Sequence, residues 1–253
     1  MHILPAVRLT AALNAQAGEP GGAEERRARS VIGSDVAHHV ADPEDLLGVG
    51  GLHAVELAEA LPRLGSREAA GWVLTLPAPG LLGALRGPGE LNVAALDAGA
   101  AVIAATAGLA LVPYRVGPAV QWRIFPAERP APPADPYEAE RALSEAVLAA
   151  AGTLTRLDVA GGTRPDDPQL QLPSGYPNKQ RFAADRAIRL LVACEAALSD
   201  DGASISSYEA DLRARELRAV RDAARTALCA AVTWHRTPGD APAPARDRLR
   251  ASD

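Results

Sequence analysis

The sequence predicts an α+β protein: a helical N-terminal segment, a small antiparallel sheet at about residues 72–125, and three C-terminal helices packed on the sheet and on each other. Short apolar runs bounded by glycine and proline, which are typical of strands, fill the middle of the chain. After residue 134 the apolar residues recur every three or four positions, which is the period of a helix.

The core of such a protein has few large side chains to draw on. The chain has 253 residues, enough to bury a sizeable core, but only 4% of them are aromatic. Alanine, leucine and valine must therefore fill most of the interior. We expect the large residues to lie inside it, namely Trp72, Trp122, Trp234, Phe125 and Phe182.

The first 70 residues show helical patterns at 3–16, 23–32 and 52–61. The third helix should end near Pro62, because proline has no backbone N–H and clashes with the preceding turn. Residues 36–40 predict a short strand.

The sheet is expected from four runs, "GWVLTLP", "AAVIAAT", "LALVPYRVG" and "AVQWRIFPA". The last three are separated by too few residues for parallel crossovers, so we expect an antiparallel meander. A short helix at 90–98, stopped by Gly99, precedes the second run.

A proline-rich linker at 126–133 separates this part from the helical region. The first C-terminal helix begins with Asp135 as N-cap and the third with a capping box, Ser206 to Glu209. The second runs over about 178–198, and the third ends near residue 234. We expect residues 1–126 and 134–236 to form one globular unit and residues 237–253 to be a disordered tail.

Composition argues against several classes of protein. The net charge of −5 argues against a nucleic-acid binder, and the arginines of the last helix alternate with acids, which is typical of a salt-bridged solvent face. The N-terminus has no signal-peptide pattern, and the longest apolar run is too short and interrupted for a membrane span. Cys194 and Cys229 lie in helical patterns and predict reduced, buried thiols. The sequence predicts a cytoplasmic protein.

No motif identifies a reaction, and we assign no catalytic residue, cofactor or metal ligand. The "GVGG" loop at 48–51 lacks the lysine of a phosphate-binding loop and predicts a turn. His38 and His39 stand near several acids, but neighbours on a strand point to opposite faces, so one ion cannot easily take both.

Two groups of polar residues remain as binding candidates. Tyr114, Arg115, Trp122 and Arg123 alternate along two neighbouring strands, so Trp122 and Arg123 should face opposite sides of the sheet. The polar turn at 176–181 holds Lys179, which is the single lysine of the chain. With one loop arginine added, the candidate ligand-binding residues are Arg86, Tyr114, Arg115, Trp122, Arg123, Tyr176, Lys179 and Arg181.

The runs "AGWVLTLPAPG", "LNVAALDAG", "LVPYRVGPAVQWRIFPA" and "LPSGYPNKQRFAADRAIRLL" resemble those of an uncharacterised protein family of high-GC Gram-positive bacteria. The resemblance covers residues 71–234 and implies a bacterial cytoplasmic protein without an assigned role.

Two functions fit these observations better than a third, DNA binding. The first is a non-enzymatic binding or regulatory protein that engages a protein partner, or a second copy of itself, through a groove or a helical face. The alternative is an enzyme or small-molecule binder in which Arg86, Arg115, Arg123, Lys179 and Arg181 hold an anionic ligand between sheet and helices.

Overall fold

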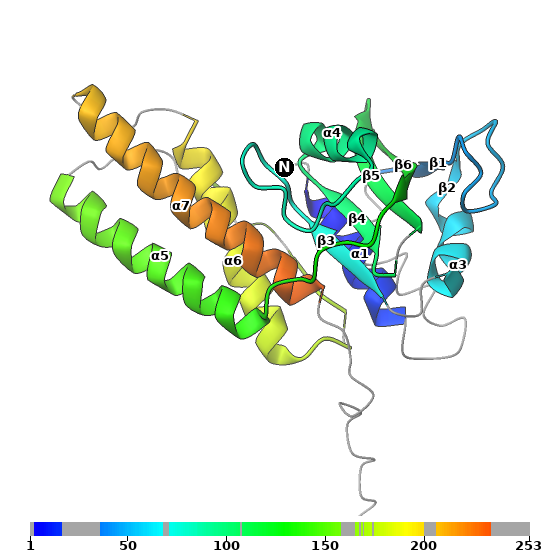
Figure 1. Cartoon of the computed structure of the whole chain (residues 1–253). Helices are drawn as coiled ribbons and strands as arrows, with labels where there is room; N and C mark the ends of the chain where they lie inside the picture. Colours follow the sequence, from blue (N-terminus) through cyan, green and yellow to red (C-terminus); the bar gives the residue numbers. More distant parts are fainter. Residues whose placement is uncertain are drawn as a thin grey trace, which may run out of the picture.

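The computed structural model describes residues 3–16, 36–67, 71–106, 108–157, 165–166, 168, 170–173, 175–199 and 206–233. It confirms the α+β class: a six-stranded sheet with its own helices stands beside three long C-terminal helices (Figure 1). The predicted helix at 23–32, Trp234 and the predicted tail lie outside the described residues. Within the described part of the chain, no helix is long and apolar enough to cross a membrane.

The sheet has the strand order β2-β1-β6-β5-β4-β3. The strands are β1 (His38–Ala41), β2 (Val55–Glu56), β3 (Trp72–Thr75), β4 (Ala101–Ala104), β5 (Gly108–Val116) and β6 (Ala119–Ala127). The predicted meander is confirmed, because β3, β4, β5 and β6 pair antiparallel in succession. The whole sheet is mixed, however, since β1 pairs with β6 in parallel. The long stretch of chain between β1 and β6 permits a parallel pairing that short turns do not allow.

Alternate residues of the strands enter two separate cores. Leu109 and Leu111 of β5 belong to a large core shared with α1 (Leu4–Gln16), α3 (Leu57–Arg67) and the C-terminal helices. Ala110 and Val112 point to the opposite face, which α4 (Gly89–Ala98) covers with a smaller core. This two-residue alternation is the geometry of a strand, and it places each polar strand residue on a defined face.

Helix α3 differs from the expectation that it ends near proline. It begins at Leu57 and runs through Pro62 to Arg67, while Val55 and Glu56 form strand β2 instead. Pro62 is exposed, whereas Leu61 and Leu64 on either side of it are buried. We attribute the continuation to this burial, which offsets the one helical hydrogen bond that proline cannot make.

The C-terminal helices are α5 (Pro136–Leu157), α6 (Asn178–Ala197) and α7 (Ser207–Val232). The predicted caps are present, because Asp135 Oδ1 accepts from the amides of Tyr137 and Glu138 and Ser206 forms a capping box with Glu209. Helices α5 and α6 both pack against α7 (Figure 1). They start at the same end, so they run parallel to each other and antiparallel to α7.

Strand β3 joins the sheet to the helices. It is the outermost strand, whose free edge would leave backbone groups without partners. Asn14 of α1 accepts from the Trp72 amide at 2.7 Å and donates to the Trp72 carbonyl at 2.9 Å. The amide of Leu74 donates to Thr233 Oγ1 at 3.0 Å, just beyond α7. Side chains from both ends of the chain therefore cover this edge.

Candidate functional site

The candidate residues on the strands divide between the two faces of the sheet. Trp122 is buried in the large core and donates its indole N–H to His38 Nδ1 at 3.1 Å. Arg123 is exposed on the α4 side, where its guanidinium lies 4.8 Å from the centre of the Phe125 ring. Trp122 and Arg123 thus face opposite sides, as their alternation predicts.

Tyr114 is the candidate that lies with Arg123. Both are on the α4 side, near Asp97 at the end of α4. Burial raises the pKa of the Tyr114 hydroxyl, with Arg123 lowering it and Asp97 raising it further. Arg115 follows Tyr114 and faces the other side of the sheet, where it is exposed. The carboxylate of Asp97 beside Tyr114 and Arg123 makes this part of the sheet a poor place for an anion.

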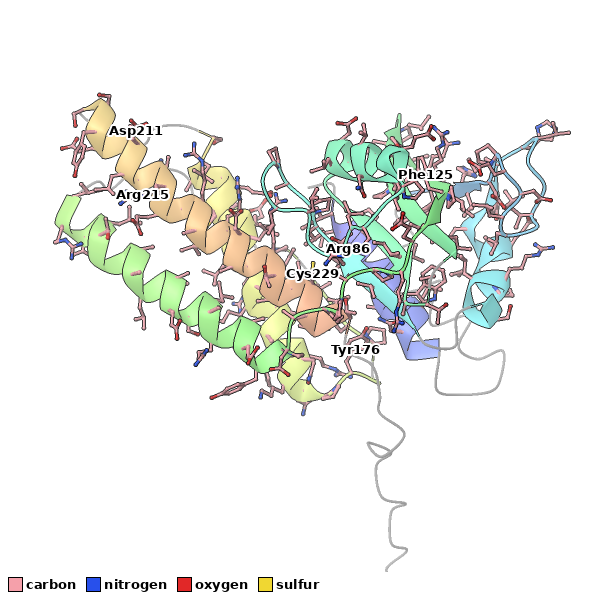
Figure 2. All side chains as sticks on the ribbon, viewed as in Figure 1. Arg86, Phe125, Tyr176, Asp211, Arg215 and Cys229 are labelled. Atoms are coloured by element: carbon pink, nitrogen blue, oxygen red, sulfur yellow. The ribbon has the colours of Figure 1, made fainter. Side chains whose placement is uncertain are left out.

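The remaining candidates lie in other parts of the molecule. Arg86 is exposed in the loop before α4 and donates to the carbonyl of its neighbour Leu85 at 3.2 Å. Figure 2 shows Arg86 in this loop, and Tyr176 at the end of the helical region that adjoins the sheet, where α7 ends. Arg115 and Arg123 face opposite sides of the sheet, so the five cations proposed for an anionic ligand do not all line one pocket.

The turn before α6 is largely a structural feature. Tyr176 is buried, its hydroxyl donates to the Val232 carbonyl at 2.7 Å, and burial raises its pKa. Arg181 donates to the carbonyl of Pro173 at 3.0 Å, which ties the turn to the helix. Lys179 differs from both, because it is exposed and its Nζ lies 5.2 Å from the centre of the Tyr137 ring.

The residues considered for metal binding or nucleophilic chemistry have structural surroundings that do not favour either. Asp42 is buried and accepts from the amides of Leu46 and Leu47, which fixes the loop after β1. Burial raises the pKa of the Cys194 thiol to about 11 and that of Cys229 to about 12, so neither is a reactive thiolate at neutral pH. The described residues hold no group of three or more His, Cys, Asp and Glu side chains placed to bind a metal ion.

Helices α5 and α6 meet along a surface that the sequence did not single out. We call it the seam. At the end where both helices start, the exposed fractions of Tyr137 and Phe182 are 65% and 75%, and Lys179 lies over the Tyr137 ring. Phe182 follows Lys179 by three residues, so the two share a face of α6.

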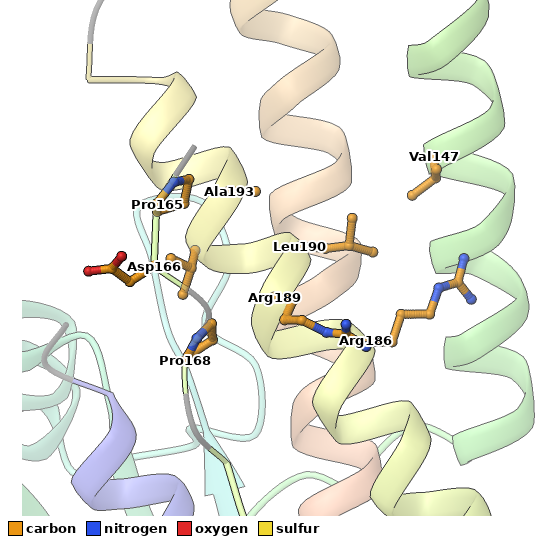
Figure 3. A pocket seen from close by; sticks show the side chains of 9 residues that line it. Val147, Pro165, Asp166, Pro168, Arg186, Arg189, Leu190 and Ala193 are labelled. Carbon is orange, nitrogen blue, oxygen red and sulfur yellow. The ribbon is translucent and has the colours of Figure 1, made fainter. Parts of the chain in front are cut away.

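Farther along the seam, polar side chains bridge the two helices. Arg186 of α6 forms an ion pair with Glu140 of α5 and donates to Ser144 Oγ at 3.0 Å. Next to this bridge is a cleft of about 420 Å³, lined mostly by apolar atoms, which extends from Val147 of α5 across α6 to Pro165 and Pro168. Figure 3 shows Val147 of α5 and Leu190 of α6 pointing toward each other in it. The seam is thus an aromatic end, a polar bridge and an apolar cleft in succession.

The comparisons with known proteins identify the family through both halves of the chain. Residues 21–139 match the model of the Rv1486c-like protein, N-terminal domain, and residues 137–229 match that of the Rv1486c-like protein, C-terminal domain. The chain belongs to the Rv1486c-like family. No curated protein and no solved structure matches it. The Rv1486c-like family is uncharacterised, so membership assigns no activity.

The two domains of the Rv1486c-like family divide the chain at residues 137–139, in the first turn of α5. The sheet belongs to the N-terminal domain and the helices to the C-terminal domain. The seam residues from Tyr137 to Leu190 therefore lie within the C-terminal domain of this family.

Phe182 is the residue that the sequence reasoning misplaced. It was expected in the core, but it is 75% exposed. The signal was present, because the buried residues of α6 include Ala184, Ala187, Ile188 and Leu191, and Phe182 lies off this stripe. Leu148 of α5, which is 74% exposed, is likewise off the stripe of its helix. Large apolar residues away from a helical stripe would have pointed to this surface.

Proposed function

We propose that the protein is a non-enzymatic, cytoplasmic binding protein that engages a protein partner through the seam between α5 and α6. The observation that carries the proposal is the exposure of Tyr137 and Phe182 in a chain with so few aromatic residues. Exposed aromatic side chains cost solubility, and aromatic residues are enriched at the energetic centres of protein interfaces. We also propose that the protein is bacterial, as the sequence resemblance implies.

The cleft beside these residues supports the same function. A partner that covers Tyr137 and Phe182 also reaches Val147 and Leu190, so one surface offers both aromatic anchors and an apolar hollow. Such a surface suits a protein partner better than a small anion, because its arginines are engaged with neighbouring carboxylates. Arg186 pairs with Glu140, and Arg189 pairs with Asp185 at 2.7 Å.

Photocrosslinking in the native host tests this proposal. The full-length chain would carry p-benzoylphenylalanine at position 182 or, as a control, at position 208. Tyr208 is 72% exposed at the opposite end of the helical region, so the two positions are matched in side chain and exposure. We expect a discrete crosslinked protein from position 182 that position 208 does not give.

The captured protein is then purified and its affinity measured. We expect Phe182→Ala to bind it at least about tenfold more weakly than the wild type, and Tyr208→Ala to bind it as the wild type does. Crosslinking without dependence on position, or an unchanged affinity of Phe182→Ala, would contradict the proposed function.

A further inference from the structure

The seam has the dimensions of a groove for one helix. From Lys179 to Leu190, α6 rises by about 16 Å, which corresponds to three turns of a partner helix. Apolar side chains lie at both ends of this distance, Phe182 with Tyr137 at one end and Leu190 with Val147 at the other. A helix laid along the seam would contact both ends with residues spaced at i, i+3 or i+4, i+7 and i+11.

The two helices differ in the charge they present at the aromatic end. Helix α5 has Asp135 as its cap and Glu138 in its first turn, and both offset the positive end of its dipole. Helix α6 follows Pro177, which gives no side-chain cap, and has no acidic residue in its first turn. The positive end of α6 is therefore left without a compensating acid on its own helix.

Lys179 adds a full positive charge at the same place. The cations farther along the seam are neutralised, Arg186 by Glu140 and Arg189 by Asp185. Lys179 instead lies over the Tyr137 ring, and among the described residues it has no carboxylate partner. The seam thus combines an apolar track with an end at which α6 presents a positive charge and α5 presents the exposed acids Asp135 and Glu138.

From this combination we infer that the partner presents an amphipathic helix with an acidic residue at one end. Its apolar face covers the seam from Phe182 to Leu190, and its carboxylate meets Lys179 at the start of α6. The inference rests on the proposed function and adds to it the chemistry and the orientation of the bound segment. The attraction supplies register and specificity more than it supplies affinity.

A library of displayed helical peptides, selected on the full-length protein, tests this inference without knowledge of the partner. Peptides that bind the wild type and not Phe182→Ala are retained, and Tyr208→Ala serves as the control for loss of an exposed aromatic residue. We expect the retained peptides to share apolar residues at helical spacing and an acidic residue beyond one end of them.

The retained peptides are then measured against Lys179→Glu and against Arg63→Glu, a control on an exposed position of α3. We expect Lys179→Glu to weaken binding at least about fivefold and Arg63→Glu to leave it unchanged, with the difference shrinking as salt is raised. Thermal unfolding of each variant verifies that it is folded.

The outcomes separate this inference from the function on which it rests. Peptides that depend on Phe182 but lack acidic residues, or that bind Lys179→Glu as well as the wild type, overturn the acidic helix and leave the seam as the interface. A selection in which no peptide depends on Phe182 overturns both.

Discussion

The sheet half and the helical half of the molecule treat their aromatic residues in opposite ways. In the sheet half, Trp72 and Trp122 are completely enclosed, with exposed fractions of 1% and 0%. In the helical half, Tyr137, Phe182 and Tyr208 are each at least 65% exposed, and Tyr176 is the one described aromatic residue that is buried. Burial of a large aromatic side chain stabilises a fold, whereas exposure contributes nothing to it. Both halves contribute buried apolar residues to the large core, and the comparison indicates that they differ in where their large aromatic side chains lie. The exposed aromatic residues of the helical half are the ones on which the proposed function rests.

The two halves are nevertheless joined by specific polar contacts. Arg225 of α7 donates to the carbonyl of Pro77 at 3.1 Å and pairs with Glu195 of α6 at 3.2 Å, so it connects the loop after β3 with two helices. Asn14 and Thr233 hydrogen-bond the backbone of β3, and we call these contacts together with Arg225 the joint. Substitutions in the core, at the joint and at the seam should differ in their effect on stability. Each of them tests one part of the comparison.

The largest effect is expected for Trp122→Ala. Trp122 is fully buried in the large core, beside Val40 of β1 and Pro113 of β5, and its loss leaves a cavity there. We expect the free energy of unfolding to fall by about 3–5 kcal/mol, measured by urea denaturation and circular dichroism. A loss below 1 kcal/mol would show that the enclosed Trp122 ring does not stabilise the fold as its burial predicts.

The joint is tested by Thr233→Val, which keeps the shape of the side chain and removes its hydroxyl. The Leu74 amide then has no acceptor at a buried position, and we expect a loss of roughly 1–3 kcal/mol. Thr226→Val is the matched control on α7, because Thr226 is exposed and its hydroxyl bonds only within its own helix. Equal losses in both variants would argue against a role of Thr233 at the edge of β3.

A smaller effect is expected from pH, through His38. Burial lowers the pKa of His38 below 6.5, and the charges of His39 and Arg8 lower it further. The unfolded chain then takes up this proton more readily than the folded protein does, so this contribution to stability is present above pH 6.5 and is lost as pH falls through the folded-state pKa. A protonated Nδ1 also cannot accept from the Trp122 indole N–H.

Denaturation curves at pH 7.5 and 5.5 measure this effect. We expect His38→Gln to lose less stability between the two values than the wild type, and His53→Gln, at an exposed position, to behave as the wild type. The same pH dependence in His38→Gln as in the wild type would exclude His38 as its source.

The elements were predictable from sequence wherever a local signal decides them. Asp135, Ser206 and Gly99 mark helix ends by hydrogen bonds or backbone geometry within a few residues, and these ends were placed correctly. The parallel pairing of β1 with β6 and the joint of Asn14 with Trp72 depend on residues far apart in the chain. No local pattern encodes such pairs.

For the same reason, only part of the candidate site could be predicted from the sequence. Alternation along a strand correctly separated Trp122 from Arg123, since period two is a local property. It could not show that Lys179 meets Tyr137, because that contact requires α5 and α6 to start at the same end. The seam arises from the packing of two helices on a third, and each helix alone carries only an apolar residue off its stripe.

The smallest effect on stability is expected at the seam itself, from Phe182→Ser. The ring is 75% exposed and supports no buried contact on which the fold depends, so we expect the free energy of unfolding to change by no more than about 0.5 kcal/mol. Leu191→Ala, on the buried face of the same helix, should cost about 2–5 kcal/mol under the same conditions. A large loss in Phe182→Ser would mean that the ring stabilises the helical half. The exposure of Phe182 would then no longer support the seam as a binding surface.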